Sequence, residues 1–193
     1  MDSTIRLRRL TALLGSAALL ASMTVATVAA PASAVNCVPW TDQTVVNDGD
    51  CYYYDGLDIN VAEMDGGEVT GGPDHDFVDT LSGGTFNGGG GNDGVRVIDN
   101  NFVGDGGTFN GGKGDDWVEA LGVGTFNGGP GDDVVVGELY DGPFNGGPGD
   151  DCADVVYGGA TYAGGGGSDT YRRDLDGLIW SAVQAGPCPD VTP

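Results

Sequence analysis

The sequence is poor in basic residues. Only seven of its 193 residues are Lys or Arg, against 29 Asp and Glu, and the formal net charge is −22. Beyond residue 34 the only basic side chains are Arg96, Lys113, Arg172 and Arg173. Such a charge balance argues against nucleic acids and anionic membrane surfaces as partners, and it favours inorganic cations.

Sequence motifs of the common hydrolases are also missing. His75 is the only histidine, and the chain has neither a His-Glu-x-x-His zinc motif nor a Gly-x-Ser-x-Gly nucleophile elbow. The adjacent carboxylates at 115–116, 132–133 and 150–151 are better explained as metal ligands with solvated neighbours than as acid and base catalysts. We therefore expect a protein that is not an enzyme.

Long apolar runs are absent after residue 34. Before it, a basic segment at 6–9 precedes the uncharged apolar stretch 10–30, which ends in small residues at 31–34. This order is typical of a secretory signal peptide. A membrane anchor is the alternative, but the small-residue ending favours cleavage after Ala34. Residues 1–34 carry three Arg and one Asp, so the expected secreted, extracellular chain of 159 residues has a net charge of −24.

Cysteine is scarce, but its four copies are even in number and all follow residue 34. In an exported chain this number predicts two disulfides, for which three pairings are possible. The pairing Cys37–Cys51 with Cys152–Cys188 is favoured, because each bond then closes a short loop near one end of the chain.

Glycine is abundant, with 38 copies that recur at fixed places. Glycine pairs begin at residues 71, 88, 111, 128, 146 and 164. The recurrence favours an ordered repeat over disorder, and a period near 18 residues predicts a solenoid in which each rung packs on its neighbours. The one longer spacing, from 88 to 111, predicts a bulging insertion at residues 98–102.

Each rung contains two short strand-like segments with an apolar middle residue. In one segment these residues are Val78, Val95, Val118, Val135, Ala153 and Tyr171; in the other they are Phe86, Phe109, Phe126, Phe144 and Tyr162. Because neighbouring strand residues point to opposite faces, the interior should pair a mostly Val column with an aromatic column. Two buried side chains per rung do not offset the ordering of some 18 residues at roughly 1–2 kcal/mol each.

The glycine pairs open six-residue loops that end in a carboxylate. The sixth-position residues are Asp76, Asp93, Asp116, Asp133, Asp151 and Asp169. Glycine lets carbonyl oxygens converge, and carbonyls with carboxylates form the hard oxygen site that Ca²⁺ prefers. Bare carboxylates stacked about 4.8 Å apart repel by roughly 3 kcal/mol at an effective dielectric of ~20. A divalent ion in each of the five gaps between successive loops would convert this repulsion into a crosslink.

These loops resemble the Gly-Gly-x-Gly-x-Asp-x-U-x repeats (U is a large aliphatic residue) of the repeat-in-toxin (RTX), or haemolysin-type calcium-binding, family. The resemblance covers residues 71–172. It implies an all-β fold, a right-handed parallel β-roll or β-solenoid of about 18 residues per rung, with Ca²⁺ between loops and folding that depends on Ca²⁺. It carries the ligand role over to the six aspartates. The other loop positions implied are Gly88, Gly90, Asn92, Gly111, Lys113, Asp115, Gly128, Pro130, Asp132, Gly146, Pro148, Asp150, Gly164 and Gly166.

Three features depart from the family pattern. Only every second nonapeptide keeps the loop, so we expect one ion column on one edge. The first loop has Asp74 where the fourth glycine belongs. Family members usually carry a C-terminal export signal and a separate catalytic domain, whereas this chain has an N-terminal signal and no room for such a domain.

Four regions are expected: the signal peptide 1–34, an N-terminal cap 35–70, the calcium-binding roll 71–172 and a C-terminal cap 173–193 whose apolar residues, from Leu175 to Val183, cover the last rung. The predicted function is that of a secreted calcium-binding protein that Ca²⁺ folds outside the cell. The alternative is an adhesin, matrix or ice- and surface-binding protein that uses an outward Thr-x-Asn face, with a cell-surface or matrix partner that the sequence does not identify. That face comprises Thr85, Thr108, Thr125 and Thr161 beside Asn87, Asn110, Asn127 and Asn145.

Overall fold

The computed structural model describes residues 37–39, 45–47, 50–53, 58–98, 106–175, 178–180 and 183–188. All of them lie in the compact unit formed by residues 35–193, and the expected signal peptide lies outside them. Within these ranges no helix is long and apolar enough to cross a membrane.

The regular structure of the described residues consists of β-strands. The first eight are β1 (Val38–Pro39), β2 (Val45–Val46), β3 (Cys51–Tyr53), β4 (Asn60–Thr70), β5 (Phe77–Gly90), β6 (Gly94–Ile98), β7 (Thr108–Lys113) and β8 (Trp117–Leu121). The others are β9 (Thr125–Asn127), β10 (Val134–Leu139), β11 (Pro143–Pro148), β12 (Cys152–Tyr157), β13 (Thr161–Gly166), β14 (Thr170–Leu175), β15 (Leu178–Trp180) and β16 (Gln184–Ala185).

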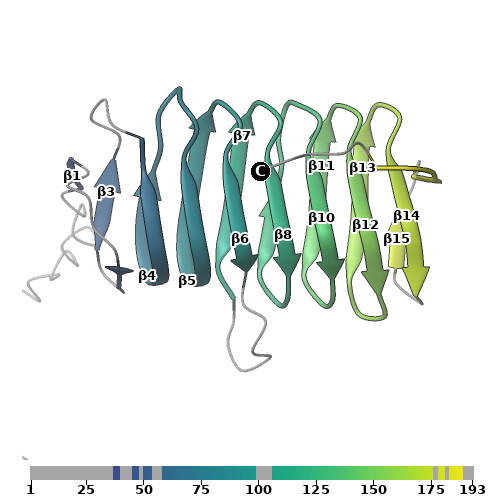
Figure 1. Cartoon of the computed structure of the whole chain (residues 1–193), viewed down its shortest axis with the longest axis horizontal. Helices are drawn as coiled ribbons and strands as arrows, with labels where there is room; N and C mark the ends of the chain where they lie inside the picture. The colour runs from purple at the N-terminus through teal and green to yellow at the C-terminus, as the bar shows by residue number, and fades with distance from the viewer. Residues whose placement is uncertain are drawn as a thin grey trace, which may run out of the picture. The chain divides into compact units, whose positions relative to one another are not determined.

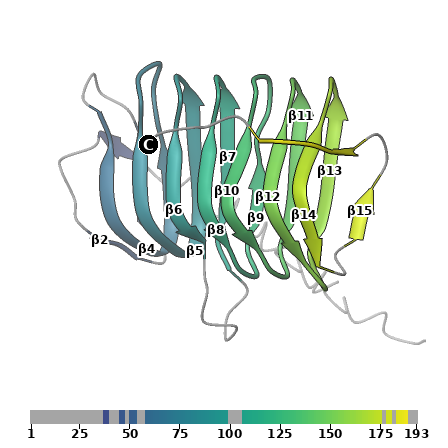
Figure 2. The ribbon, with the colours of Figure 1, turned by 45° about the vertical axis from the view of Figure 1, so that its right-hand side comes forward.

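The strands stack in parallel as a solenoid of about seven turns, roughly 18 residues apart. Strands β5, β7, β9, β11, β13 and β15 follow one another on one face, and β6, β8, β10, β12, β14 and β16 on the other (Figure 1). Strand β5 belongs to both faces, because residues 77–81 pair with β6 and residues 85–90 with β7. Figure 2 shows the two faces as separate layers joined at their edges. The predicted all-β parallel solenoid is confirmed.

The two predicted interior columns are confirmed. Val78, Val95, Val118 and Val135 are paired rung by rung and fully buried, as is Ala153 after them. The opposite column consists of the fully buried rings of Phe86, Phe109, Phe126, Phe144 and Tyr162. Successive rings stack at centroid distances of 4.8–5.1 Å and are nearly parallel. Each ring therefore covers the faces of its neighbours and forms the buried aromatic column that the repeat predicts.

A third interior column was not predicted. Its fully buried members are Met64, Leu81, Ile98, Leu121, Leu139 and Val156. Strict alternation misses them because two inward residues three apart, such as Val78 and Leu81, require the strand to bend. In β10 this break is a register shift between Val135 and Glu138. The interior is therefore thicker than the expected two side chains per rung.

The expected insertion at 98–102 is wrong at its first residue. Ile98 ends β6, pairs with Leu81 and Leu121, and is fully buried in the third column. Its side chain continues a core position that Leu81 and Leu121 fill in the neighbouring rungs, so the strand extends to it. Residues 99–102 lie outside the described residues.

Regular stacking begins before the first glycine loop. In β4, Val61 and Met64 pair with β5 residues of the Val and third columns, and Val69 pairs with Phe86. All three side chains are fully buried.

Both predicted disulfides, Cys37–Cys51 and Cys152–Cys188, are confirmed.

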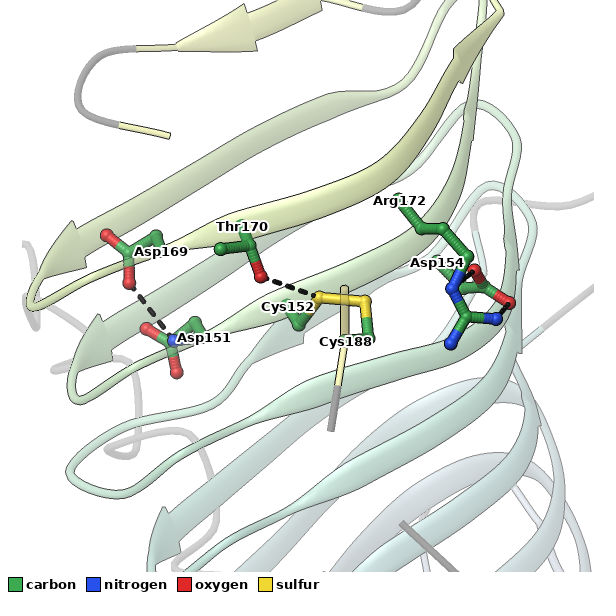
Figure 3. Close-up of a disulfide and its surroundings, with 7 residues drawn as sticks. All are labelled: Asp151, Cys152, Asp154, Asp169, Thr170, Arg172 and Cys188. Atoms are coloured by element: carbon green, nitrogen blue, oxygen red, sulfur yellow. Dashed lines mark hydrogen bonds and ion pairs between the residues drawn. A yellow bond between two sulfur atoms is a disulfide. The ribbon is translucent and has the colours of Figure 1, made fainter. Parts of the chain in front are cut away.

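The C-terminal segment covers the end of the solenoid in part as predicted. Val183 packs against the main core, but Leu175 is 42 % exposed, so its expected covering role is wrong. Leu175 is in register with Tyr157, which follows the inward Val156 and therefore points outward. Beyond β16 the chain crosses to β12, where Cys188 bonds Cys152 (Figure 3).

The outer surface of the Val face carries a second apolar cluster. The Trp117 indole lies over Gly94 of the preceding rung, and a Cβ on that glycine would lie 2.3 Å from the indole ring. The same ring stacks on Phe77 at 5.7 Å, and Trp117 also packs against the cluster formed by Val134, Cys152 and Cys188. Trp117 therefore spans several rungs from the outside.

Candidate metal centre

The glycine loops lie side by side along one edge, because the strands that flank them are in register on both faces. Their sixth-position carboxylates form one buried column. Its members, each at most 2 % exposed, are Asp76, Asp93, Asp116, Asp133, Asp151 and Asp169. Carboxylates are almost never fully buried without a partner. The stacking that the repeat imposes has therefore placed six acidic groups where water cannot solvate them.

One oxygen of each carboxylate is hydrogen-bonded along the column. The Oδ1 atom accepts the backbone N–H of the corresponding residue in the preceding rung, at 2.7–3.1 Å. Ile59 donates to Asp76 at the start of the series, and Figure 3 shows the last bond, from Asp151 to Asp169. These bonds hold each side chain in one orientation, with Oδ2 turned into its own loop.

The second oxygen is unpartnered in five of the six loops. The five Oδ2 atoms, buried and without a hydrogen bond, belong to Asp93, Asp116, Asp133, Asp151 and Asp169. In the first loop, by contrast, Oδ2 of Asp76 accepts the N–H of Gly72 at 2.9 Å. A buried polar group without a partner costs about 1–3 kcal/mol, and more when it is charged. The five oxygens therefore need a proton or a cation.

Burial raises the pKa of four of these carboxyl groups. It brings the pKa of Asp93 and Asp151 to about 7, and the pKa of Asp116 and Asp133 to about 8. Neighbouring carboxylates of the column raise these values further, whereas the backbone hydrogen bonds oppose the rise. Without a cation, the interior of the column therefore holds protons near neutral pH.

The glycines of the loop have two different roles. A Cβ on the first glycine would lie 2.0 Å from Oδ2 in the loop of Gly128 and Asp133, and at most 2.1 Å in the other five loops. The first position is therefore glycine to make room for the carboxylate. The second and fourth glycines of the last five loops instead have positive φ values, as at Gly129 (118°) and Gly131 (147°), which other residues rarely adopt.

Loop carbonyls form a ladder between the last four loops. The N–H groups of Gly112 and Gly114 donate to the carbonyls of Gly128 and Pro130 at 2.8 and 3.0 Å. The acceptors in the next two loops are Gly146, Pro148 and Gly166. The same edge carries the other residues predicted at the first and third loop positions, which are Gly88, Gly90, Gly111, Lys113 and Gly164. A carbonyl oxygen keeps a second lone pair when it accepts one hydrogen bond.

The fifth loop position faces solvent. Asn92, Asp115, Asp132 and Asp150 are exposed, and each accepts, through Oδ1, the N–H of the fifth residue in the following rung at 2.7–3.0 Å. Exposed His75 contacts the backbone of Asn92 in the same row. The predicted helper carboxylates therefore lie on the outer side of the loop, away from the buried column.

The donors of this edge suit a hard cation. Among the described residues no three His, Cys, Asp or Glu side chains converge on one point, so a site here combines carboxylate and carbonyl oxygens. Five unpartnered oxygens in one column, each beside a glycine that leaves room for it, fit Ca²⁺ ligation. The sequence predicted the six aspartates as ligands and showed the departure of the first loop at Asp74. It did not reveal which carboxylate oxygen is free, or that Oδ2 of Asp76 is hydrogen-bonded within its own loop.

One further polar atom near the column was missed by sequence reasoning. The Tyr162 hydroxyl is buried without a hydrogen-bond partner. Burial, followed by the charges of Asp151 and Asp169, raises the pKa of this phenol. The only signal in the sequence was a Tyr in a column that is otherwise Phe.

Comparison of the chain with protein-family models, curated proteins and solved structures gives no match.

Proposed function

We propose that this chain is a calcium-binding protein whose stacked glycine loops hold Ca²⁺ between successive rungs. The observation that carries the proposal is the column of five buried Oδ2 atoms without a partner, at Asp93, Asp116, Asp133, Asp151 and Asp169. These oxygens would be the charged ligands, and carbonyls of the same loops the neutral ones. When bound, Ca²⁺ supplies positive charge between carboxylates that otherwise repel one another.

Calcium binding to this column stabilises the folded chain. The carboxylates come together only when the rungs stack, so an ion that binds them favours the folded over the unfolded state. The apolar leader at 10–30 and the two disulfides support a role outside the cell. Extracellular calcium modules work with dissociation constants of about 10⁻⁴–10⁻³ M, so weak sites suffice there. We propose no catalytic role and no nucleic acid partner.

Circular dichroism and calorimetry on the purified chain test this proposal. We expect Ca²⁺ to bind with measurable heat and to raise the thermal midpoint, and excess EGTA to reverse both effects. Mg²⁺ at equal concentration is the control, because its small octahedral shell fits a carbonyl-rich loop poorly. A chain that shows the same β spectrum and the same midpoint in Ca²⁺ and in EGTA does not have this function.

A second candidate function uses the outer surface of the aromatic face. The Thr residues of β5, β7 and β9 are paired in register, and the Asn side chains beside them form a chain of amide hydrogen bonds. Asn110 donates to Asn87, Asn127 to Asn110 and Asn145 to Asn127, at 2.8–2.9 Å. This ladder holds one row of a regular polar surface rigid, which favours binding to an ordered surface such as ice or a polysaccharide. Thermal hysteresis and pull-down on insoluble polysaccharide, both with Ca²⁺ present, test it; absence of both effects rejects it.

A further inference from the structure

The first glycine loop differs from the five that follow, and the difference begins in its sequence. The fourth position, a glycine with φ between 101° and 152° in the other loops, is Asp74 here. The second glycine also differs: Gly72 does not have the positive φ of its counterparts, which is 108–128°. The backbone of this loop therefore has a different conformation from that of the other five. This fits the sequence, because Asp favours negative φ values, whereas glycine tolerates positive ones.

The altered backbone turns one amide inward. In the third and fourth loops the N–H of the second glycine leaves the loop and donates to the following rung, as from Gly112 to Gly128 and from Gly129 to Gly146. In the first loop the N–H of Gly72 donates to Oδ2 of its own Asp76, and the carbonyl of Gly72 accepts from Gly90. The loop thus supplies from its own backbone the partner that the other loops lack.

Both oxygens of Asp76 are consequently satisfied by the protein. Oδ1 accepts the N–H of Ile59 at 2.7 Å and Oδ2 that of Gly72 at 2.9 Å. A cation at this carboxylate would have to displace or face a backbone N–H donor, which carries positive partial charge. A carboxylate capped by amides on both oxygens has no need of a metal ion.

The ends of the column are closed by apolar residues. Ile59, 1 % exposed, occupies the aspartate position one rung before Asp76. Val183 occupies the corresponding position one rung after Asp169, because Gln184 pairs with Thr170 and Val183 packs against the core. The column of free oxygens is therefore bounded on both sides, by the capped Asp76 and Ile59 at one end and by Val183 at the other.

We infer that the calcium column begins at Asp93, that it holds four ions, and that the first glycine loop is a metal-independent end cap. This inference rests on the proposed calcium function. Among the described residues, adjacent carboxylates with a free Oδ2 on both sides occur only in the pairs 93/116, 116/133, 133/151 and 151/169. The gap between Asp76 and Asp93 lacks this arrangement, so the ion count is one lower than the five gaps that six equivalent loops would provide.

The test is an ion count with a matched pair of variants. Native mass spectrometry and calorimetry with Ca²⁺ on the purified chain should give four ions. The variant Asp76→Asn should still bind four, with affinities within twofold of the unmodified chain. The same change at the same loop position, Asp116→Asn, removes a charged ligand from two gaps and should lose two ions or weaken them at least tenfold.

The outcomes separate this inference from the function beneath it. Five ions on the unmodified chain, or loss of an ion in Asp76→Asn, overturns the inference and leaves calcium binding in place. No ion on the unmodified chain overturns the calcium function as well. If Asp76→Asn does not fold because it loses the cap on Gly72, the count on the unmodified chain still decides between four and five.

Discussion

Replacing Asp133 by Asn should have opposite effects on stability with and without calcium. Asn keeps an Oδ1 atom for the N–H of Asp116, which donates to the present side chain at 2.8 Å. It puts an uncharged amide beside Gly128, in place of the unpartnered Oδ2. In EGTA the substitution therefore removes a buried charge and keeps the hydrogen bond along the column.

The size of the effect follows from the pKa of this group. Burial raises the pKa of Asp133 from 3.8 to about 8. Ionising a carboxyl group of that pKa inside the folded chain at pH 8 costs about 5 kcal/mol relative to the unfolded chain. We expect Asp133→Asn to recover a good part of this in EGTA. In Ca²⁺ it removes a ligand from two gaps, and each site filled at 100 times its dissociation constant contributes about 2.7 kcal/mol.

Urea denaturation followed by circular dichroism at pH 8, in EGTA and in saturating Ca²⁺, measures both effects. Asp132→Asn is the control, since Asp132 is the exposed neighbour whose Oδ1 accepts the N–H of Asp150. It should change the free energy of unfolding by less than about 0.5 kcal/mol in either buffer. If Asp133→Asn is destabilising in EGTA as well as in Ca²⁺, its carboxylate is a structural group and the charge argument fails.

Three further predictions follow from the same edge. The folded-state pKa values of Asp93, Asp116, Asp133 and Asp151 are raised, so the contribution of these four groups to stability is complete below pH 3.8 and is lost as pH rises through about 7–8. Denaturation in EGTA should therefore become easier from pH 5 to pH 8, and saturating Ca²⁺ should abolish this trend. Gly128→Ala should destabilise the chain by several kcal/mol and weaken Ca²⁺ binding, since its Cβ would lie 2.0 Å from Oδ2 of Asp133, whereas Gly166→Ala, with nothing within 4 Å, should be neutral in the same thermal melt. Tyr162→Phe should raise the free energy of unfolding in EGTA by about 1 kcal/mol, because it removes an unpartnered buried hydroxyl and keeps the stack on Phe144; a lower free energy would mean that the hydroxyl has a partner.

Much of the fold was predictable because the repeat states it many times. Each repeat contains one inward position that is mostly Val and one inward aromatic position. The spacing between repeats therefore predicts the strand register, the two interior columns and the edge on which the loops lie. The disulfides were predictable because so few pairings exist. The third column was not predictable, because its members lie three residues after the Val column, or four in β10. Only a bend, or the register shift after Val135 in β10, brings both residues inward.

The candidate site was predictable only as a set of residues. The aspartates stand out by position, but nothing in their identity says that Oδ1 is taken and Oδ2 is free. Which oxygen is free depends on where the backbone N–H of the preceding rung points, as at Ile59 and Asp76, which donate to Oδ1 of Asp76 and Asp93. The departure at Asp74 was visible in the sequence; its consequence, an inward N–H at Gly72, depends on the φ angle of another residue.

The fit of Trp117 over Gly94 affects which rungs can pair with one another when the chain folds. Neighbouring rungs such as 126–133 and 144–151 are almost identical, so a chain that skips one whole rung while folding would still match Val to Val and Phe to Phe. Trp117 breaks this degeneracy, because its indole fits only where the preceding rung offers Gly94 and no side chain. Other rungs present Asn60, Phe77, Val134, Cys152 or Thr170 at that place. A single large side chain opposite a single small one thus marks the correct frame in a sequence that otherwise repeats itself.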